Sequence, residues 1–112
     1  MLPRKRRIPS ILFADQQKGR KYHSPHIFLS AVNLPNLETK VSFSISKKIA
    51  KNAPTRNLFR RRGYSIIKKQ LKNLKNGGLL FFSAKKRVND ISFKIIEEEV
   101  LELLKKSGFL MS

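Results

Sequence analysis

The sequence has no cysteine and no tryptophan, and only seven of its 112 residues are acidic. Without cysteine, disulfide bonds and thiolate metal ligands are excluded, as suits a reducing compartment. No run of 18 apolar residues occurs, and the apolar stretch after the basic N-terminus is short and contains Pro9 and Ser10. We therefore expect neither a membrane-spanning helix nor a secretory signal, and we place the protein in the cytoplasm with no membrane partner.

Basic residues dominate the charge. The 25 Lys and Arg give a formal net charge of +18. All but three of them lie in residues 1–89, and the only acidic residues in that part of the chain are Asp15 and Glu38. An excess of one sign repels itself in a compact fold, so an anionic partner is the simplest reason to keep it. With 40% hydrophobic residues the chain can still fold. The composition therefore indicates a folded domain that binds a polyphosphate.

The spacing of apolar residues predicts one α+β domain over residues 1–112, with residues 1–7 as a flexible basic arm. Predicted helices cover residues 8–18, 52–76 and 92–106. Predicted strands cover residues 26–32, 40–46 and 79–84, and a turn covers residues 33–38. Gly19, Gly77-Gly78 and Gly108 would end the helices, while Asn52 and Ser92 would cap the last two. The order is α-β-β-α-β-α, with room for one further strand before the long helix. It predicts a two-layer α/β sandwich on a small sheet.

The same periodicity predicts which side chains are buried. On the long helix one face gathers Phe59, Gly63, Ile66, Ile67, Leu71 and Leu74. Strand 40–46 alternates, which would turn Val41, Phe43 and Ile45 inward and leave Ser42, Ser44 and Ser46 on an open face. On strand 26–32, Ile27, Leu29 and Ala31 form the better core set, which exposes Phe28 beside the serines, as stacking of an unpaired base requires. In the alternative the parity is reversed and Phe28 is core.

No set of side chains in the sequence suggests a protein enzyme. His23 and His26 are the only histidines. As a metal pair they lack nearby carboxylate partners, and the simpler interpretation is one loop histidine and one strand-end histidine. The run 97–99 is acidic, but consecutive helical residues point in different directions, which favours a solvated face. We therefore predict no catalytic residues and no metal ligands in the protein.

The segment 46–62 carries the strongest binding signal. It places basic and amide side chains on a strand end, a turn and the first turns of a helix, whose positive pole adds to them. A run of charge is usually a solvated face, but no acidic residue between Glu38 and Asp90 neutralises this one. RNA and DNA are not separated by this pattern.

This segment resembles the bacterial ribonuclease P protein component. Members carry Ser-Lys-Lys at a strand end and, about eight residues later, an Arg-Asn-Arg-x-Lys-Arg signature that opens a long helix. Here Ser46-Lys47-Lys48 is followed at that interval by Arg56-Asn57-Leu58-Phe59-Arg60-Arg61. The opening Met1-Leu-Pro-Arg-Lys5 and the order of elements also match, so the resemblance covers the whole chain.

Three departures from the family pattern stand out. Leu58 replaces a signature arginine, for which Arg62 is the nearest substitute. Tyr64-Ser65 stands where members have Arg-Glu. The aromatic positions of the first helix are Leu12 and Gln16, with Phe13 adjacent.

The resemblance implies a left-handed βαβ crossover, against the general right-handed rule. It implies a subunit of the ribonuclease P ribonucleoprotein, in which a catalytic RNA and its Mg²⁺ cleave the 5′ leader from precursor tRNA and the protein alone is inactive. No obligatory protein partner is implied. The expected contacts with the catalytic RNA are Arg56, Asn57, Arg60, Arg61 and Lys68. The expected contacts with the leader or precursor tRNA are Leu12, Phe13, Phe28, Ser30, Ser44, Ser46, Lys47 and Lys48.

Two rival functions remain at this stage. A ribosomal or ribosome-assembly protein that coats RNA with no catalytic partner has the same composition, and the spacing of the signature is what favours ribonuclease P. A basic membrane-surface protein is the weaker rival, because the cationic helix face has no exposed apolar face beside it.

Overall fold

The computed structural model of the chain describes residues 3–33, 38–85 and 92–111. Its centre is a four-stranded sheet in the order β1-β2-β4-β3. The strands are β1 (Arg20–His23), β2 (Ile27–Asn33), β3 (Lys40–Ser44) and β4 (Gly78–Ala84). Neighbours pair antiparallel except β3 and β4, which are parallel and are joined by a helical crossover. The α+β class is therefore confirmed, and the left-handed sense of that crossover stays a prediction.

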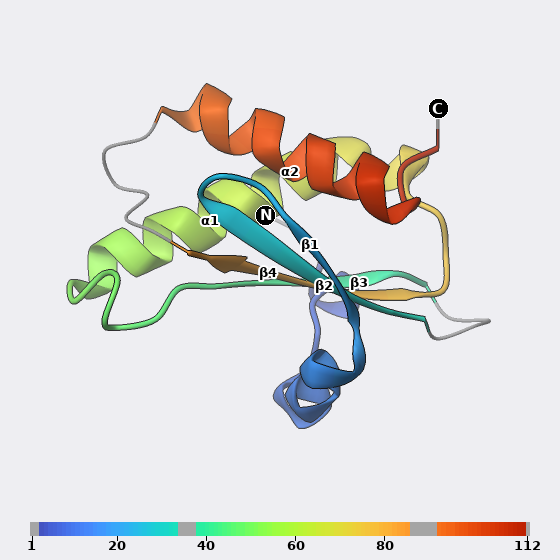
Figure 1. The fold of residues 1–112 in the computed structure, drawn as a ribbon, viewed down its shortest axis with the longest axis horizontal. Coiled ribbons are helices and arrows are strands. Elements are labelled where there is room, and N and C mark those ends of the chain that lie inside the picture. Colours follow the sequence, from blue (N-terminus) through green and yellow to red (C-terminus); the bar gives the residue numbers. More distant parts are fainter. Residues whose placement is uncertain (1–2, 34–37, 86–91, 112) are drawn as a thin grey trace.

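Helices cover both faces of the sheet (Figure 1). The helices α1 (Ala53–Gln70) and α2 (Phe93–Ser107) lie together on one face. The opposite face carries the 3₁₀ helix η2 (Ser10–Lys18), drawn in blue below the sheet in Figure 1. Shorter 3₁₀ turns are η1 (Arg4–Arg6) and η3 (Leu71–Asn73). Within the described ranges no helix has the length and apolar content needed to cross a bilayer.

The predicted bounds lie within one residue of those of α2, β2 and β4, and they differ more for the other elements. Strand β1 was missed, and β3 ends two residues before its predicted end. Helix α1 ends at Gln70 rather than near residue 76. After η3 the backbone is extended at Leu74, which forms an isolated β-bridge with Leu110. The first helix has the 3₁₀ form and begins at Ser10. Most of the predicted turn over 33–38 lies outside the described residues.

The caps and the buried face of α1 follow the sequence prediction. The Asn52 side chain accepts a hydrogen bond from the Thr55 backbone N–H at 3.4 Å, with Pro54 in the first turn. The residues Phe59, Gly63, Ile66 and Ile67 are buried, Leu71 is half-buried, and Leu74 is buried beyond the helix end. Together with α2 they cover the face of the sheet that carries Ile27, Leu29, Val41 and Phe43. The predicted parity of both strands is thus confirmed.

Gly63 allows α1 to lie directly on the sheet. A Cβ built there would come within 2.5 Å of Cγ of Phe43. That ring cannot retreat, because it is stacked on Phe82 at 4.8 Å and meets Phe59 edge-on at 5.9 Å. The glycine is therefore required by packing.

Gly63→Ala is expected to lower the free energy of unfolding by about 1–2 kcal/mol. Overpacking a core costs roughly 1–3 kcal/mol, and the better helix propensity of alanine returns up to ~1 kcal/mol. Urea denaturation measures the difference against Ser65→Ala, an exposed position on the same helix. Equal stability of the two variants would show that the ring can move aside.

The second face of the sheet is less open than predicted. Ile8, Leu79 and Phe81 form a small apolar cluster there, with Leu12 and Val32 packed against it. The Ser30 hydroxyl donates to the Gln16 carbonyl at 2.5 Å, and Ser30 and Ser42 are both buried. The expectation of a continuous exposed serine row is therefore wrong for Ser30, which the chain before β1 contacts, and for Ser42, which pairs with Phe81 of the apolar cluster. Ser44 and Ser46 remain exposed.

Candidate nucleic-acid interface

A tight turn presents basic side chains at the start of α1. The backbone N–H groups of Ile49 and Ala50 both donate to the Ser46 carbonyl, and Lys47 and Lys48 are exposed on this turn. Arg56 joins turn and helix, since its Nη1 donates to the carbonyl oxygens of Ala50 at 2.8 Å and Lys51 at 3.0 Å. Part of its donor capacity thus holds the turn in place, and within the described part of the chain its other nitrogens have no such bond.

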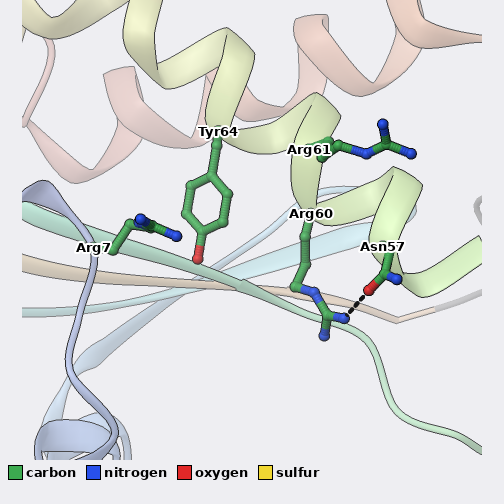
Figure 2. A pocket seen from close by; sticks show the side chains of 5 residues that line it. All are labelled: Arg7, Asn57, Arg60, Arg61 and Tyr64. Atoms are coloured by element: carbon green, nitrogen blue, oxygen red, sulfur yellow. Dashed lines mark hydrogen bonds between the residues drawn. The ribbon is translucent and has the colours of Figure 1, made fainter. Parts of the chain in front are cut away.

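Three of the five predicted contacts with the catalytic RNA gather with two residues that were not predicted, while Arg56 and Lys68 do not line the same hollow. A pocket of about 400 Å³ lies between α1 and the N-terminal segment. We call it the basic pocket, and it is lined by Arg7, Asn57, Arg60, Arg61 and Tyr64 (Figure 2). Arg60 donates to Oδ1 of Asn57, which fixes the guanidinium at the pocket wall. Arg61 points away from the sheet in Figure 2 and is exposed.

The segment predicted as an arm lies along the free edge of β3. Arg7 forms a parallel bridge with Val41, and the Ile8 N–H donates to the Val41 carbonyl at 3.1 Å. Arg6 holds the same edge, with its Nε 3.2 Å from Glu38 and its Nη1 donating to the Thr39 carbonyl at 3.2 Å. These contacts bring Arg7 to the pocket, which no local sequence signal shows.

The substitute proposed for the missing signature arginine faces elsewhere. The Arg62 guanidinium lies 6.0 Å from the centre of the Phe93 ring on α2, and Nζ of Lys69 lies 5.9 Å from the same centre. Arg62 is therefore held against α2 and does not line the basic pocket. Leu58 is exposed, and so is Lys68 further along α1.

A second group of predicted residues lies on the sheet face that η2 partly covers. Strand pairing aligns His23, Phe28, Ser83 and Ser44 across all four strands, and we call this line the sheet row. Phe28 is half-exposed, with its ring centre 5.8 Å from that of His23. Oγ of Ser83 lies 3.1 Å from Oγ of Ser44. The row therefore offers the half-exposed Phe28 ring and the exposed Ser44, whereas Ser83 is buried and its hydroxyl contacts Ser44 and Gln16.

Helix η2 borders the sheet row. Gln16 reaches it, with Nε2 donating to Ser83 Oγ at 3.4 Å. Phe13 is half-exposed and meets Phe81 edge-on at 6.1 Å, whereas Leu12 is half-buried. Gln16 and Ser83 were not predicted as site residues. The sequence did contain a signal for Ser83, because it is the one hydroxyl residue in the strongly apolar run 79–84.

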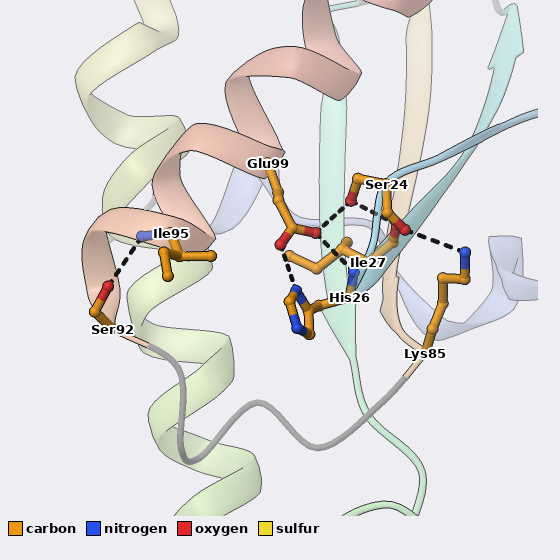
Figure 3. Close-up of polar contacts among 7 residues, drawn as sticks. All are labelled: Ser24, His26, Ile27, Lys85, Ser92, Ile95 and Glu99. Carbon is orange, nitrogen blue, oxygen red and sulfur yellow. Dashed lines mark hydrogen bonds and ion pairs between the residues drawn. The ribbon is translucent and has the colours of Figure 1, made fainter.

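The prediction that the acidic run 97–99 is a solvated face is wrong for Glu99. This carboxylate is buried; Ser24 Oγ donates to its Oε1 at 2.5 Å, and the His26 backbone N–H does so at 2.8 Å (Figure 3). Nδ1 of His26 lies 2.6 Å from Oε2. Burial raises the pKa of Glu99, but the hydrogen bonds from Ser24 and His26 outweigh it and leave that pKa lowered. The group ties α2 to the β1–β2 turn.

Comparison with known families and structures gives one family. The family model described as Ribonuclease P matches residues 5–108. No curated protein sequence matches significantly.

Solved structures match the fold at low sequence identity. A Staphylococcus aureus RNase P protein mutant with defective mRNA degradation activity has a TM-score of 0.84 at 19% identity, over 94% of this chain and 90% of that chain. The RNase P protein from Thermotoga maritima has a TM-score of 0.78 at 15% identity, over 89% of this chain and 96% of that chain. At such identities the likeness supports the fold alone.

Proposed function

Because the chain belongs to the Ribonuclease P family, whose model matches residues 5–108, we propose that it is the protein subunit of ribonuclease P. In this role it binds the catalytic RNA and the 5′ leader of precursor tRNA. It assists the Mg²⁺-dependent endonucleolytic cut that gives the mature 5′ end. The observation that carries the proposal is the family match together with the place of the signature, on the exposed first turns of α1.

The basic pocket supports binding to the catalytic RNA. It gathers the guanidinium groups of Arg7, Arg60 and Arg61 around one hollow. Among the described residues no carboxylate lies within ion-pair distance of Arg60 or Arg61. Guanidinium groups bind phosphate oxygens in pairs, so free ones on a helix suit an RNA backbone. Lys68, exposed two turns further along α1, would extend the contact.

The sheet row supports binding to the leader. Phe28 offers a partly exposed ring for a base, and the exposed Ser44 offers a hydroxyl for the strand beside it. The helix η2 borders this strip with Phe13 and Gln16, which favours a single strand over a duplex. Ser46, Lys47 and Lys48 follow Ser44 beyond the end of β3, toward the start of α1, and would carry the strand toward the catalytic RNA.

The described residues bring together no set of carboxylates that could hold Mg²⁺. In the described ranges no three His, Cys, Asp or Glu side chains come together, and the buried Glu99 already has its oxygens bonded to Ser24 and His26. As part of the proposed role, we assign the metal and the chemical step to the catalytic RNA.

A reconstitution assay tests the proposal. Purified protein alone is expected to leave precursor tRNA uncut. The catalytic RNA at limiting Mg²⁺ is expected to cut slowly, and adding the protein is expected to restore efficient cleavage at the mature 5′ end. Specific cleavage by RNA-free protein, or no effect of the protein on the RNA reaction, would overturn the proposal.

A further inference from the structure

A second hollow adjoins the basic pocket on the other side of Arg7. It measures about 490 Å³ and is lined by Arg4, Arg7, Ile8, Pro9, Lys40 and Tyr64. Both hollows share Arg7 and Tyr64, so they adjoin each other between the N-terminal segment and α1, along the outer edge of β3. We call the two adjoining hollows together the edge groove.

Cations line the whole edge groove. Arg4 and Lys40 lie at one end, Arg60 and Arg61 at the other, and Arg7 between them. The described residues that line it include no carboxylate. Opposed cations in one groove repel each other, and an anion that runs the length of the groove would relieve that repulsion.

Arg7 occupies the centre of the groove with an unused donor. Its Nε is buried and has no hydrogen-bond partner among the described residues. A buried donor without a partner is costly, and a charged one more so. Its backbone is already fixed by the bridge to Val41, so the side chain is positioned in advance for a ligand.

Tyr64 forms the shared wall. Its ring meets Phe43 edge-on at 5.5 Å, which anchors it to the core, and its hydroxyl points into the space between Arg7 and Arg60 (Figure 2). A hydroxyl held there can donate to an anionic oxygen.

We propose that the edge groove binds the sugar–phosphate backbone of an RNA strand, with one phosphate on each side of Arg7 and the Arg7 guanidinium bridging the two. The identity of that RNA as the catalytic RNA rests on the proposed function. Arg7 thereby supplies the guanidinium that α1 lacks at Leu58, from a different element, since Arg62 is held against Phe93. The N-terminal segment is one wall of the RNA site.

Binding of the catalytic RNA, measured over a range of salt concentrations, tests this role of Arg7. If the protein neutralises roughly six phosphates, the log–log salt slope is about −4 to −5. Arg7→Gln is expected to weaken binding on the order of tenfold and to make the slope less negative by about 1. Arg7→Lys is expected to keep the slope, because the charge remains, but to recover only part of the affinity, because an ammonium cannot fork between two phosphates.

Two further variants complete the set. Tyr64→Phe is expected to weaken binding a few-fold with the slope unchanged. Lys105→Gln removes an exposed charge at the end of α2 and reports the effect of net charge alone. Thermal melting of each variant shows whether it is folded.

The outcomes separate this inference from the proposed function. If Arg60→Ala with Arg61→Ala weakens binding while Arg7→Gln behaves like Lys105→Gln, the groove is overturned and the proposed function stands. If the double variant has no effect either, the RNA-binding surface on α1 is itself wrong. A lowered melting temperature for Arg7→Gln with an unchanged salt slope would assign Arg7 a structural role and overturn the groove.

Discussion

Glu99→Ala is expected to lower the free energy of unfolding at neutral pH by about 2–4 kcal/mol, an effect large enough to threaten a domain of this size. The carboxylate is buried and accepts from Ser24 Oγ and the His26 backbone N–H. Removing it takes the acceptor from the part-buried His26 N–H, leaves the Ser24 hydroxyl with the Ile27 carbonyl at 2.9 Å, and detaches α2 from the β1–β2 turn. Lys85 also contacts this turn, since its Nζ donates to the Ser24 carbonyl at 3.1 Å. Because an ammonium group only donates, Lys85 cannot replace the lost acceptor.

The same carboxylate predicts how stability depends on pH. The folded-state pKa of Glu99 is lowered from its ordinary value of 4.5, so the folded protein binds this proton less readily than the unfolded chain. Its contribution is therefore fully present above about pH 4.5 and is lost as the pH falls toward the folded-state pKa. The wild-type protein should lose stability in that acid range.

Urea denaturation at neutral pH and in the acid range measures both effects. Glu99→Gln keeps the shape but not the charge, so it should be destabilised at neutral pH and should lack this part of the acid dependence. Glu98→Ala is the matched control, because the carboxylate of Glu98, the residue before Glu99, is exposed. If Glu99→Ala is no less stable than Glu98→Ala, the buried group contributes nothing to the fold.

The features that the sequence predicted correctly are those that local chemistry decides. The caps at Asn52 and Ser92 and the left-handed Gly108, at φ 81°, follow from the residue types themselves. The alternation in β2 and β3 depends on one face being apolar, and Phe28 is accordingly on the less buried side.

The features that the sequence did not predict depend on contacts between distant segments. Strand β1 has almost no apolar pattern, with only Tyr22 partly buried, and exists because it pairs with β2. Glu99 is 73 residues from its partner His26, so its burial could not be read from an acidic run. Arg7 reaches the basic pocket because its backbone bridges to Val41. Pairing of this kind decides the position of the N-terminal segment.

The two proposed RNA surfaces lie on different elements and are expected to fail separately. Arg60→Ala with Arg61→Ala removes two guanidinium groups of the basic pocket. It should weaken binding to the catalytic RNA by about 1–3 kcal/mol, whether or not the tRNA carries a leader. The measurement is the dissociation constant of the catalytic RNA, alone and with precursor or mature tRNA bound.

Phe28→Ala is expected to leave the affinity for the catalytic RNA nearly unchanged and to reduce the preference for precursor over mature tRNA by about 1–3 kcal/mol, the value of one base stacked on an aromatic ring. Ile95→Ala is the control, because Ile95 is an exposed apolar residue on α2, on the opposite side of the sheet. Each variant must melt near the wild-type temperature, since Phe28 also contacts His23 and its loss could loosen β1. If the arginine and Phe28 variants lose the same property by similar amounts, the protein has one RNA surface and the separate leader site on the sheet row is wrong.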